Sequence, residues 1–160
     1  MAEEDPDFTH SLELNFQHPE LVEFLAYWNT KRGGKKFPDR ADIIPREIIN
    51  ILPQIILIDL GAGGREPRIR LMGTEISEAL GPGDHRGKLV SEVFPPLLFK
   101  RTERAISLVQ ESGAPVRTYA EHSAITGRDF QGNETCVAPL SSNGTDINMI
   151  IIVTKLGQSK

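Results

Sequence analysis

The sequence predicts an α+β domain with a five-stranded antiparallel sheet, short helices on one face and an extra N-terminal helix. Two observations lead to this prediction. Strand-like segments follow one another at both ends of the domain, joined by glycine-rich or Asn-Gly turns that are typical of antiparallel hairpins. Helical patterns lie between these groups of strands, so strands and helices do not alternate as they would in a parallel sheet.

The length and composition of the chain indicate one packed domain. It has 160 residues, of which 39% are hydrophobic. We expect a flexible N-terminal arm over residues 1–17, a helix and proline-rich connector over 18–52, and the sheet domain over 53–156. The net charge of −4 argues against nucleic-acid binding. The sequence starts without a signal-peptide pattern and has no apolar run long enough to span a bilayer, so we expect a cytoplasmic protein without membrane insertion.

The first helical pattern covers Pro19–Lys31. Proline fits the first position of a helix, and Gly33-Gly34 ends the pattern. The apolar residues at helical spacing are Leu21, Phe24, Leu25 and Trp28. A stripe this apolar has to be buried. We expect it to lie outside the sheet domain and to form a homodimer. The alternative is that it covers an open sheet face within one chain.

The first strand pair follows the connector. Residues 54–60 are apolar at nearly every position, which predicts a central strand buried on both faces. Gly61–Gly64 is interpreted as a turn and not as a dinucleotide-binding loop, because no helix follows it. Residues 67–73 alternate with period two and predict the hairpin partner, with Ile69 and Leu71 pointing inward.

Several helical segments surround or separate the strands. A short turn is expected between Pro45 and Ile51, ahead of the first strand. Thr74–Leu80 and Leu89–Phe94 predict two short helices after the first hairpin. A longer helix runs from Pro95 or Pro96 to Ser112, where Gly113 ends it.

Three strand-like segments end the domain, at residues 115–125, 130–140 and 146–155. Thr126-Gly127 and Ser141–Gly144 are interpreted as their hairpin connections. Because Asn-Gly is a strong hairpin signal, we expect the last two strands to pair in the firmest register.

No catalytic or metal-binding pattern is present. The four histidines have no spacing that would bring two onto one metal ion; they are His10, His18, His85 and His122. The single cysteine, Cys136, is expected to be a buried, inert thiol in a strand. No serine lies in a hydrolase elbow motif. We therefore predict no catalytic residue, no metal and no enzymatic activity.

Two groups of polar residues have both a functional and a structural interpretation. His85 lies in a charged loop, where an exposed side chain is favoured over a ligand contact or a haem ligand. His122 is expected on the surface of a strand. Lys100, Arg101 and Arg104 could line a pocket for an anionic ligand, but a solvated helix surface is favoured.

The order of elements resembles the PAS-domain family, and more specifically the alphaproteobacterial single-PAS proteins that have a leading aromatic-rich helix. The resemblance covers roughly residues 20–155 and rests on the order and spacing of these stretches: Phe24–Asn29, Phe37–Pro45, Ile51–Pro53, Ile69–Thr74 and Gly83–Gly87. It implies a bacterial protein whose sheet surrounds short helices and a small interior space. It also implies a module that senses ligands or docks onto signalling proteins such as histidine kinases.

The resemblance does not extend to the cofactor sites of the family. Flavin-binding photoreceptor PAS domains have a reactive cysteine on a helix in an Asn-Cys-Arg pattern, whereas Cys136 is in a predicted strand. Haem-binding members use a histidine on a helix that faces the cavity, and no histidine occupies such a helix here. We therefore predict no cofactor.

The prediction for function is a sensory or regulatory PAS module that binds a small ligand, docks onto a partner protein, or does both. Its expected pocket is lined by Ile56, Met72, Ile76, Leu80, Phe94 and Met149. The alternative is a small cone-shaped enzyme of the isomerase or dehydratase type, which would need an acid or base in its pocket. The expected pocket residues are apolar, which favours binding over catalysis.

Overall fold

The structure is a computed structural model, and it describes residues 5, 7–61, 66–122, 124 and 131–156. Its elements in chain order are β1 (Phe8–Ser11), α1 (Pro19–Arg32), the 3-10 turns η1 (Arg40–Asp42), η2 (Pro45–Ile48) and η3 (Leu52–Gln54), β2 (Ile55–Asp59), β3 (Arg68–Met72), α2 (Thr74–Leu80), α3 (Val90–Val93), α4 (Pro96–Ser112), β4 (Val116–His122), β5 (Gln131–Leu140) and β6 (Met149–Leu156).

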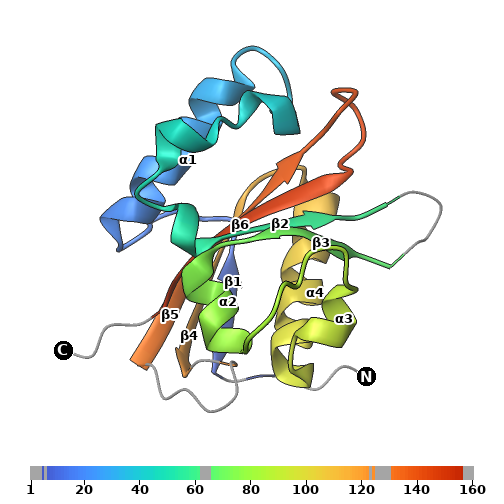
Figure 1. Ribbon diagram of the computed structural model, residues 1–160. Helices are drawn as coiled ribbons and strands as arrows, with labels where there is room; N and C mark the ends of the chain where they lie inside the picture. The colour runs from blue at the N-terminus through green and yellow to red at the C-terminus, as the bar shows by residue number, and fades with distance from the viewer. Residues whose placement is uncertain (1–4, 6, 62–65, 123, 125–130, 157–160) are drawn as a thin grey trace.

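The strands form one antiparallel sheet in the order β1-β4-β5-β6-β2-β3 (Figure 1). Strands β2 and β3 form the first predicted hairpin, and β4, β5 and β6 form the predicted meander. The β5–β6 register runs without a shift from Asn133↔Leu156 to Leu140↔Met149. The α+β class and the antiparallel hairpins are therefore confirmed.

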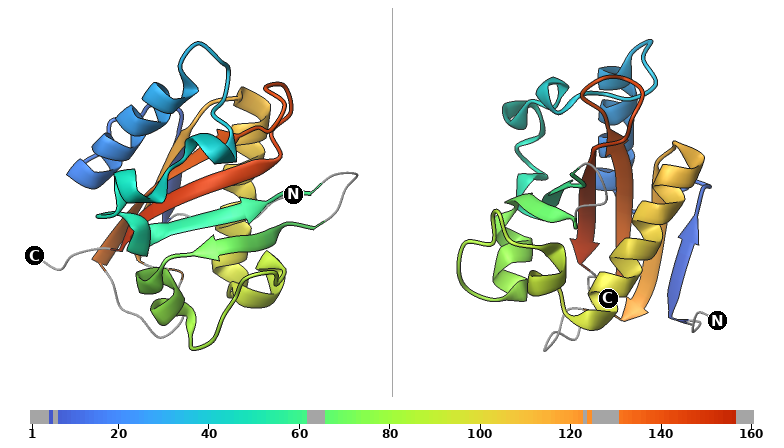
Figure 2. Two further views of the ribbon diagram at one scale, coloured as in Figure 1. Left: turned by 45° about the horizontal axis from the view of Figure 1, so that its top comes forward. Right: turned by 90° about the vertical axis from the view of Figure 1, so that its right-hand side faces the viewer.

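The sheet has six strands and not five, because part of the expected N-terminal arm is an edge strand. Residues Phe8–Ser11 pair with β4, and the right-hand view of Figure 2 shows this strand at the edge of the sheet. The carboxylate of Asp7 accepts the backbone N–H groups of Glu121 and His122, at 3.1 and 2.9 Å, which fixes the end of the pairing. The expectation of a loose arm is therefore wrong for Phe8–Ser11.

Helices cover both faces of the sheet. Figures 1 and 2 show α1 and the 3-10 turns on one face and α2, α3 and α4 on the other. Side chains that alternate along each strand accordingly enter two separate apolar clusters. Ile56 and Ile58 of β2 face the α4 side, whereas Ile55 and Leu57 face α1. This explains why β2 is apolar at nearly every position, as expected for an interior strand.

The apolar stripe of α1 packs on the sheet of its own chain. Leu21, Phe24 and Trp28 are at most 3% exposed, and Leu25 is half-buried at the margin of the same cluster. The indole Nε1–H of Trp28 donates to the carbonyl oxygen of Pro139 at 3.0 Å. The expectation that this stripe forms a homodimer interface is therefore wrong, because β5, β6 and β2 already cover it. Intrachain packing, the alternative, is what the structure has.

A β-bulge at Arg70 changes the phase of β3. Leu57 pairs with Leu71 but Ile58 pairs with Ile69, so Arg70 has no partner on β2. Ile69 faces the α4 side as expected, whereas Leu71 turns toward α1 and Met72 takes the inward position. A sequence pattern of strict alternation cannot show an inserted residue of this kind.

Of the three expected hairpin connections, the structure describes only the one between β5 and β6 in full. Residues 62–64 of the glycine-rich turn and the Thr126-Gly127 connection lie outside the described residues. The β5–β6 connection is longer than expected, because β6 begins at Met149. The side-chain oxygen of Asn143 accepts the N–H groups of Thr145 and Asp146, at 2.9 Å each, and this organises the loop. In the described part of the chain, no helix has the length and apolarity needed to cross a membrane.

Candidate functional site

A cavity of about 70 Å³ lies between the sheet and helices α2 to α4. Its walls come from β1, the helical layer and the inner face of the sheet, and are formed by Phe8, Ile56, Ile76, Phe94, Leu98, Arg101, Thr102, Ala105, Thr118, Ala120, Ala124, Asn133, Thr135, Val137, Ile152, Thr154 and Leu156. A cavity of this size is about half that of an engineered site that holds benzene, so it fits only a small molecule or group.

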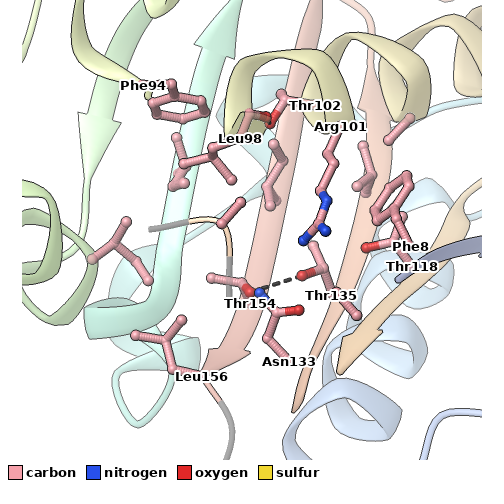
Figure 3. Close-up of a pocket in the computed structure, with 17 residues that line it drawn as sticks. Phe8, Phe94, Leu98, Arg101, Thr102, Thr118, Asn133, Thr135, Thr154 and Leu156 are labelled. Carbon is pink, nitrogen blue, oxygen red and sulfur yellow. Dashed lines mark hydrogen bonds between the residues drawn. The ribbon is translucent and has the colours of Figure 1, made fainter. Parts of the chain in front are cut away.

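The cavity has a polar end and an apolar end. Thr118, Thr135 and Thr154 occupy directly opposite positions on β4, β5 and β6, which makes a row of hydroxyls across the floor. The hydroxyls of Thr135 and Thr154 are 2.7 Å apart and hydrogen-bonded. Figure 3 shows Phe94 and Leu98 away from this row, toward the helices. The lining therefore suits an amphipathic molecule.

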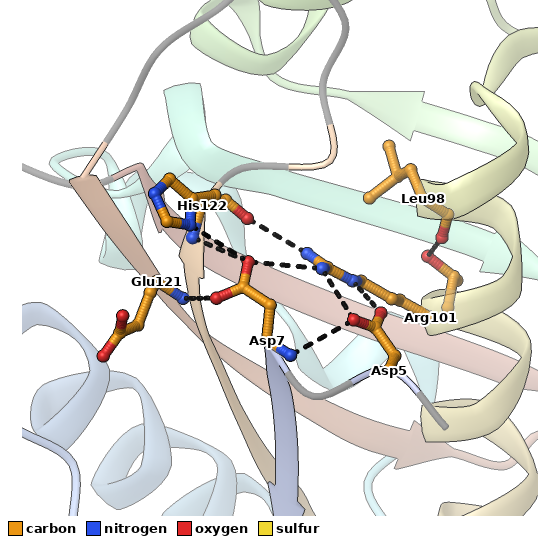
Figure 4. Close-up of polar contacts among 7 residues, drawn as sticks. Asp5, Asp7, Leu98, Arg101, Glu121 and His122 are labelled. Carbon is orange, nitrogen blue, oxygen red and sulfur yellow. Dashed lines mark hydrogen bonds and ion pairs between the residues drawn. The ribbon is translucent and has the colours of Figure 1, made fainter. Parts of the chain in front are cut away.

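Arg101 of α4 lies at the polar end and is only 7% exposed. Its guanidinium donates to both carboxylate oxygens of Asp5, from Nε at 2.7 Å and from Nη2 at 3.3 Å, and also to the carbonyl of His122 at 3.1 Å (Figure 4). Its Cζ atom lies 5.3 Å from the ring centroid of Phe8. The hydrogen bond from Arg101 holds the pKa of the Asp5 carboxyl below its usual value. This cluster joins the segment around β1 to α4 beside the cavity.

The expectation that Arg101 is a solvated helix residue is wrong, although Lys100 and Arg104 are exposed as expected. The sequence does indicate that Arg101 faces inward. It lies three residues after Leu98 and four before Ala105, which are both on the inward stripe of the helix. A charged residue on an apolar helix face indicates a buried ion pair. Its counter-ions, Asp5 and Asp7, have no such signal, because they lie in a short polar segment.

The structure places three of the six expected pocket residues in the cavity wall: Ile56, Ile76 and Phe94. Met72 and Leu80 pack at the margin of the same apolar cluster without lining the cavity. Met149 faces the opposite side of the sheet, toward α1, because Ile150 and Ile152 take the inward positions of β6. The expected phase of β6 is therefore wrong by one residue.

A second depression lies beside the loop that contains His85. Its lining residues are Leu71, Met72, Ser77, Gly83, Asp84, His85 and Arg86. His85 is half-buried and not exposed as expected: its Nε2 is 3.2 Å from the carbonyl oxygen of Gly81, and its Nδ1 is buried without a hydrogen-bond partner among the described residues. Among the described residues, no group of three histidine, cysteine or acidic side chains is placed to hold a metal ion.

A buried carboxylate occupies the opposite face of the sheet. Glu134 of β5 is 1% exposed and lies against the start of α1. It accepts the backbone N–H groups of Gln17 and His18 and the Nε–H of Arg117, at 2.9 to 3.1 Å and 2.7 Å. Burial raises the pKa of this carboxyl, but the hydrogen bonds outweigh burial and leave the pKa below its usual value. Glu134 therefore anchors α1 to the sheet.

Cys136, two residues further along β5, faces the same side and is fully buried, as expected. Burial raises the pKa of its thiol strongly, with a smaller contribution from the charge of Glu134. A thiol in this setting stays protonated and is not a nucleophile. His122, whose side chain is 73% exposed, lies on the surface as expected.

Comparison with known protein families identifies the family of this chain. The family model described as the PAS domain matches residues 16–153, which is most of the chain. The chain belongs to the PAS domain family. Membership makes this PAS domain a sensory or regulatory module of a family that is generally non-catalytic. The helix α1 and the connector lie inside the matched range, whereas β1 lies outside it.

Among the solved structures that match this PAS domain is the light-state structure of the blue-light photoreceptor Aureochrome1 LOV. The two chains are 15% identical, the match covers 73% of this chain and 91% of the other, and the TM-score is 0.43. No curated protein matches the chain.

Proposed function

We propose that this PAS domain is a ligand sensor that binds a small molecule in the cavity beneath α4 and passes the signal on by contact with another protein. The observation that supports it is the cavity itself, which lies between the sheet and the helices, as the family resemblance implies. Its apolar walls and few convergent polar groups are typical of small-molecule sites.

The lining also favours binding over catalysis. Of the described residues that form the walls, Arg101 is the one with a titratable side chain, and its counter-ions occupy it. An enzyme of the isomerase or dehydratase type needs a group that gives or takes a proton at the substrate. A guanidinium stays protonated and cannot take that role. The enzyme alternative is therefore the weaker one.

The finer parts of the proposal rest on the sequence resemblance. We place the chain among the alphaproteobacterial single-PAS proteins and in the cytoplasm. Its partner would be a signalling protein such as a histidine kinase. The ligand-binding site is the part that the geometry supports directly, and it is the part to test first.

The test is an NMR titration of the ¹⁵N-labelled protein with 1-butanol as a small neutral probe. Ala105, which is 2% exposed and lines the cavity, is replaced by valine to fill the space. Ala26→Val, on the exposed side of α1, is the matched control. We expect probe-induced shifts at the cavity residues in the wild type and in Ala26→Val, but not in Ala105→Val. Equal shifts in both variants, or no shifts at the cavity, would exclude the proposed site.

A further inference from the structure

The polar end of the cavity contains side chains that can hydrogen-bond to a ligand. Thr118 is 6% exposed and lines the cavity together with Thr135 and Thr154. Asn133, which is half-buried, lines the same end. Hydroxyl and amide groups both donate and accept hydrogen bonds, so a polar ligand atom at this end would find partners of either kind.

The guanidinium of Arg101 is at the same end. Figure 3 shows it reaching from α4 toward Thr135 and Asn133. A guanidinium that is more than nine-tenths buried requires an anion, and its planar group of N–H donors suits a carboxylate. In this structure Asp5 provides that carboxylate, and Asp7 lies 3.5 Å from Nη2.

Asp5 belongs to a part of the chain that lies at the edge of the sheet. It precedes β1, a strand of four residues that pairs on one side only and lies outside the range of the PAS family match. Besides this pairing, β1 is held by the contacts of Asp5, Asp7 and Phe8 to Arg101 and to the end of β4. An anion that takes the place of Asp5 on Arg101 has to displace only this short edge strand.

The remaining walls define the rest of the molecule that would fit. Ile76, Phe94 and Leu98 line the cavity on the helical side, and Ile152 and Val137 line it on the sheet side. These side chains offer only apolar contacts. The cavity thus combines one buried cation with an apolar compartment of small volume.

We propose that the ligand is a small amphipathic carboxylate, whose carboxylate group pairs with Arg101 in place of Asp5 and whose apolar part lies against Phe94 and Leu98. This inference rests on the proposed function and specifies the ligand class. The carboxylate of Asp5 is then an internal competitor that occupies the site in the absence of ligand. Exchange of the two carboxylates detaches the segment before β1 from α4 and so loosens the edge formed by β1 and β4, which is the structural change that a partner protein would detect.

The first experiment compares two probes of equal size. Butyrate and its neutral analogue butyramide are titrated into the ¹⁵N-labelled protein, with 1-butanol as the probe for the cavity alone. We expect butyrate to bind about tenfold or more tightly than butyramide, since a hydrogen bond to a charged group is the stronger kind. Hydrogen exchange of the amides of β1 and β4 is expected to accelerate when butyrate binds.

Two variants identify the groups involved. Asp5→Asn removes the charge of the internal competitor and should strengthen butyrate binding by about tenfold. Asp42→Asn, whose carboxylate pairs with Lys35 on the other side of the sheet, is the control and should leave binding unchanged. Arg101→Met should abolish the preference for butyrate over butyramide. If Arg101→Met does not fold, Asp5→Asn still decides the question, because it leaves Arg101 in place.

The outcomes separate this inference from the proposed function. If 1-butanol and both other probes occupy the cavity with similar affinity, or if Asp5→Asn does not bind butyrate more tightly, the carboxylate inference is wrong and the ligand-binding function stands. If no probe occupies the cavity, the proposed function fails and the inference fails with it. A preference for butyrate that survives in Arg101→Met would assign the selectivity to another residue and overturn the inference.

Discussion

The Oε1 atom of Glu134 on β5 lies 2.7 Å from Nδ1 of His18, the residue that precedes the first turn of α1. The same carboxylate pairs with Arg117 on the neighbouring strand and accepts two backbone N–H groups. A carboxylate buried to 1% exposure is stable there only because these partners replace its hydration. Helix α1 is therefore attached at its N-terminal end by a polar contact and along its length by an apolar stripe.

Glu134→Gln should destabilise the protein by about 3 kcal/mol, because the guanidinium of Arg117, whose side chain is only 17% exposed, then lacks its counter-ion. The control is Glu47→Gln, at the surface, where Glu47 pairs with Lys31 and accepts the hydroxyl of Tyr27; this change should cost about 1 kcal/mol or less. Urea unfolding at neutral pH measures both values. Equal losses in the two variants would show that Glu134 contributes no more than a surface charge.

The same carboxylate predicts a dependence of stability on pH. The folded-state pKa of Glu134 lies below the ordinary value of 4.5, so its contribution is present above about pH 4.5 and is lost as the pH falls further. Wild type and Glu134→Gln should therefore differ most at neutral pH and converge in acid. Asp5, whose pKa is also lowered, leaves some acid sensitivity in the variant. A difference that stays constant down to about pH 3 would contradict this assignment.

Trp28→Ala should destabilise the protein by about 3–5 kcal/mol, because a fully packed aromatic side chain and its bond to Pro139 are lost. Val22→Ala is the control on the same helix, where the side chain is 52% exposed and the change should stay within about 0.5 kcal/mol. Thermal unfolding gives the stability, and sedimentation gives the oligomeric state. If Trp28→Ala instead gave a stable monomer from a wild-type dimer, the stripe would be an interface between copies.

Gly73→Ala should destabilise the protein by at least about 1–3 kcal/mol. A Cβ atom at Gly73 would lie 2.2 Å from the carbonyl oxygen of Leu52 and 2.4 Å from backbone atoms of Pro53, and backbone cannot move aside as a flexible side chain can. At Gly34 a Cβ atom would meet nothing within 4 Å, so Gly34→Ala is the matched control and should be neutral or slightly stabilising. Circular dichroism during thermal unfolding compares the two variants. Similar melting temperatures would refute the close approach at Gly73.

The sequence predicted the parts of the fold that depend on local patterns. The stripe of α1, the apolar β2 and the three strands at the end all follow from periodicity, which is set by local geometry. The partner of that stripe could not be predicted, because burial requires an apolar surface without specifying which one. The bulge at Arg70 and the edge strand Phe8–Ser11 could not be predicted either, because each depends on how one segment pairs with another strand.

The candidate site was predicted in part for the same reason. Ile56, Ile76 and Phe94 follow from their elements. Met149 was assigned to the wrong face, because residues 149–153 are all apolar and the sequence therefore does not show which alternate positions of β6 face the cavity. Arg101 could have been recognised from its place on the inward stripe of its helix. Its ion pair with Asp5 could not, because the two residues are 96 positions apart in the chain.

Glu134 and Thr135 are consecutive residues of β5, and their side chains point to opposite faces of the sheet. One holds the N-terminal end of α1, and the other forms part of the cavity floor. Both are fixed to the same short piece of backbone, so a shift of β5 by a given distance moves both contacts by that distance. The cavity floor and the attachment of α1 therefore have one strand in common, and β5 connects two layers of the domain that lie on opposite faces of the sheet.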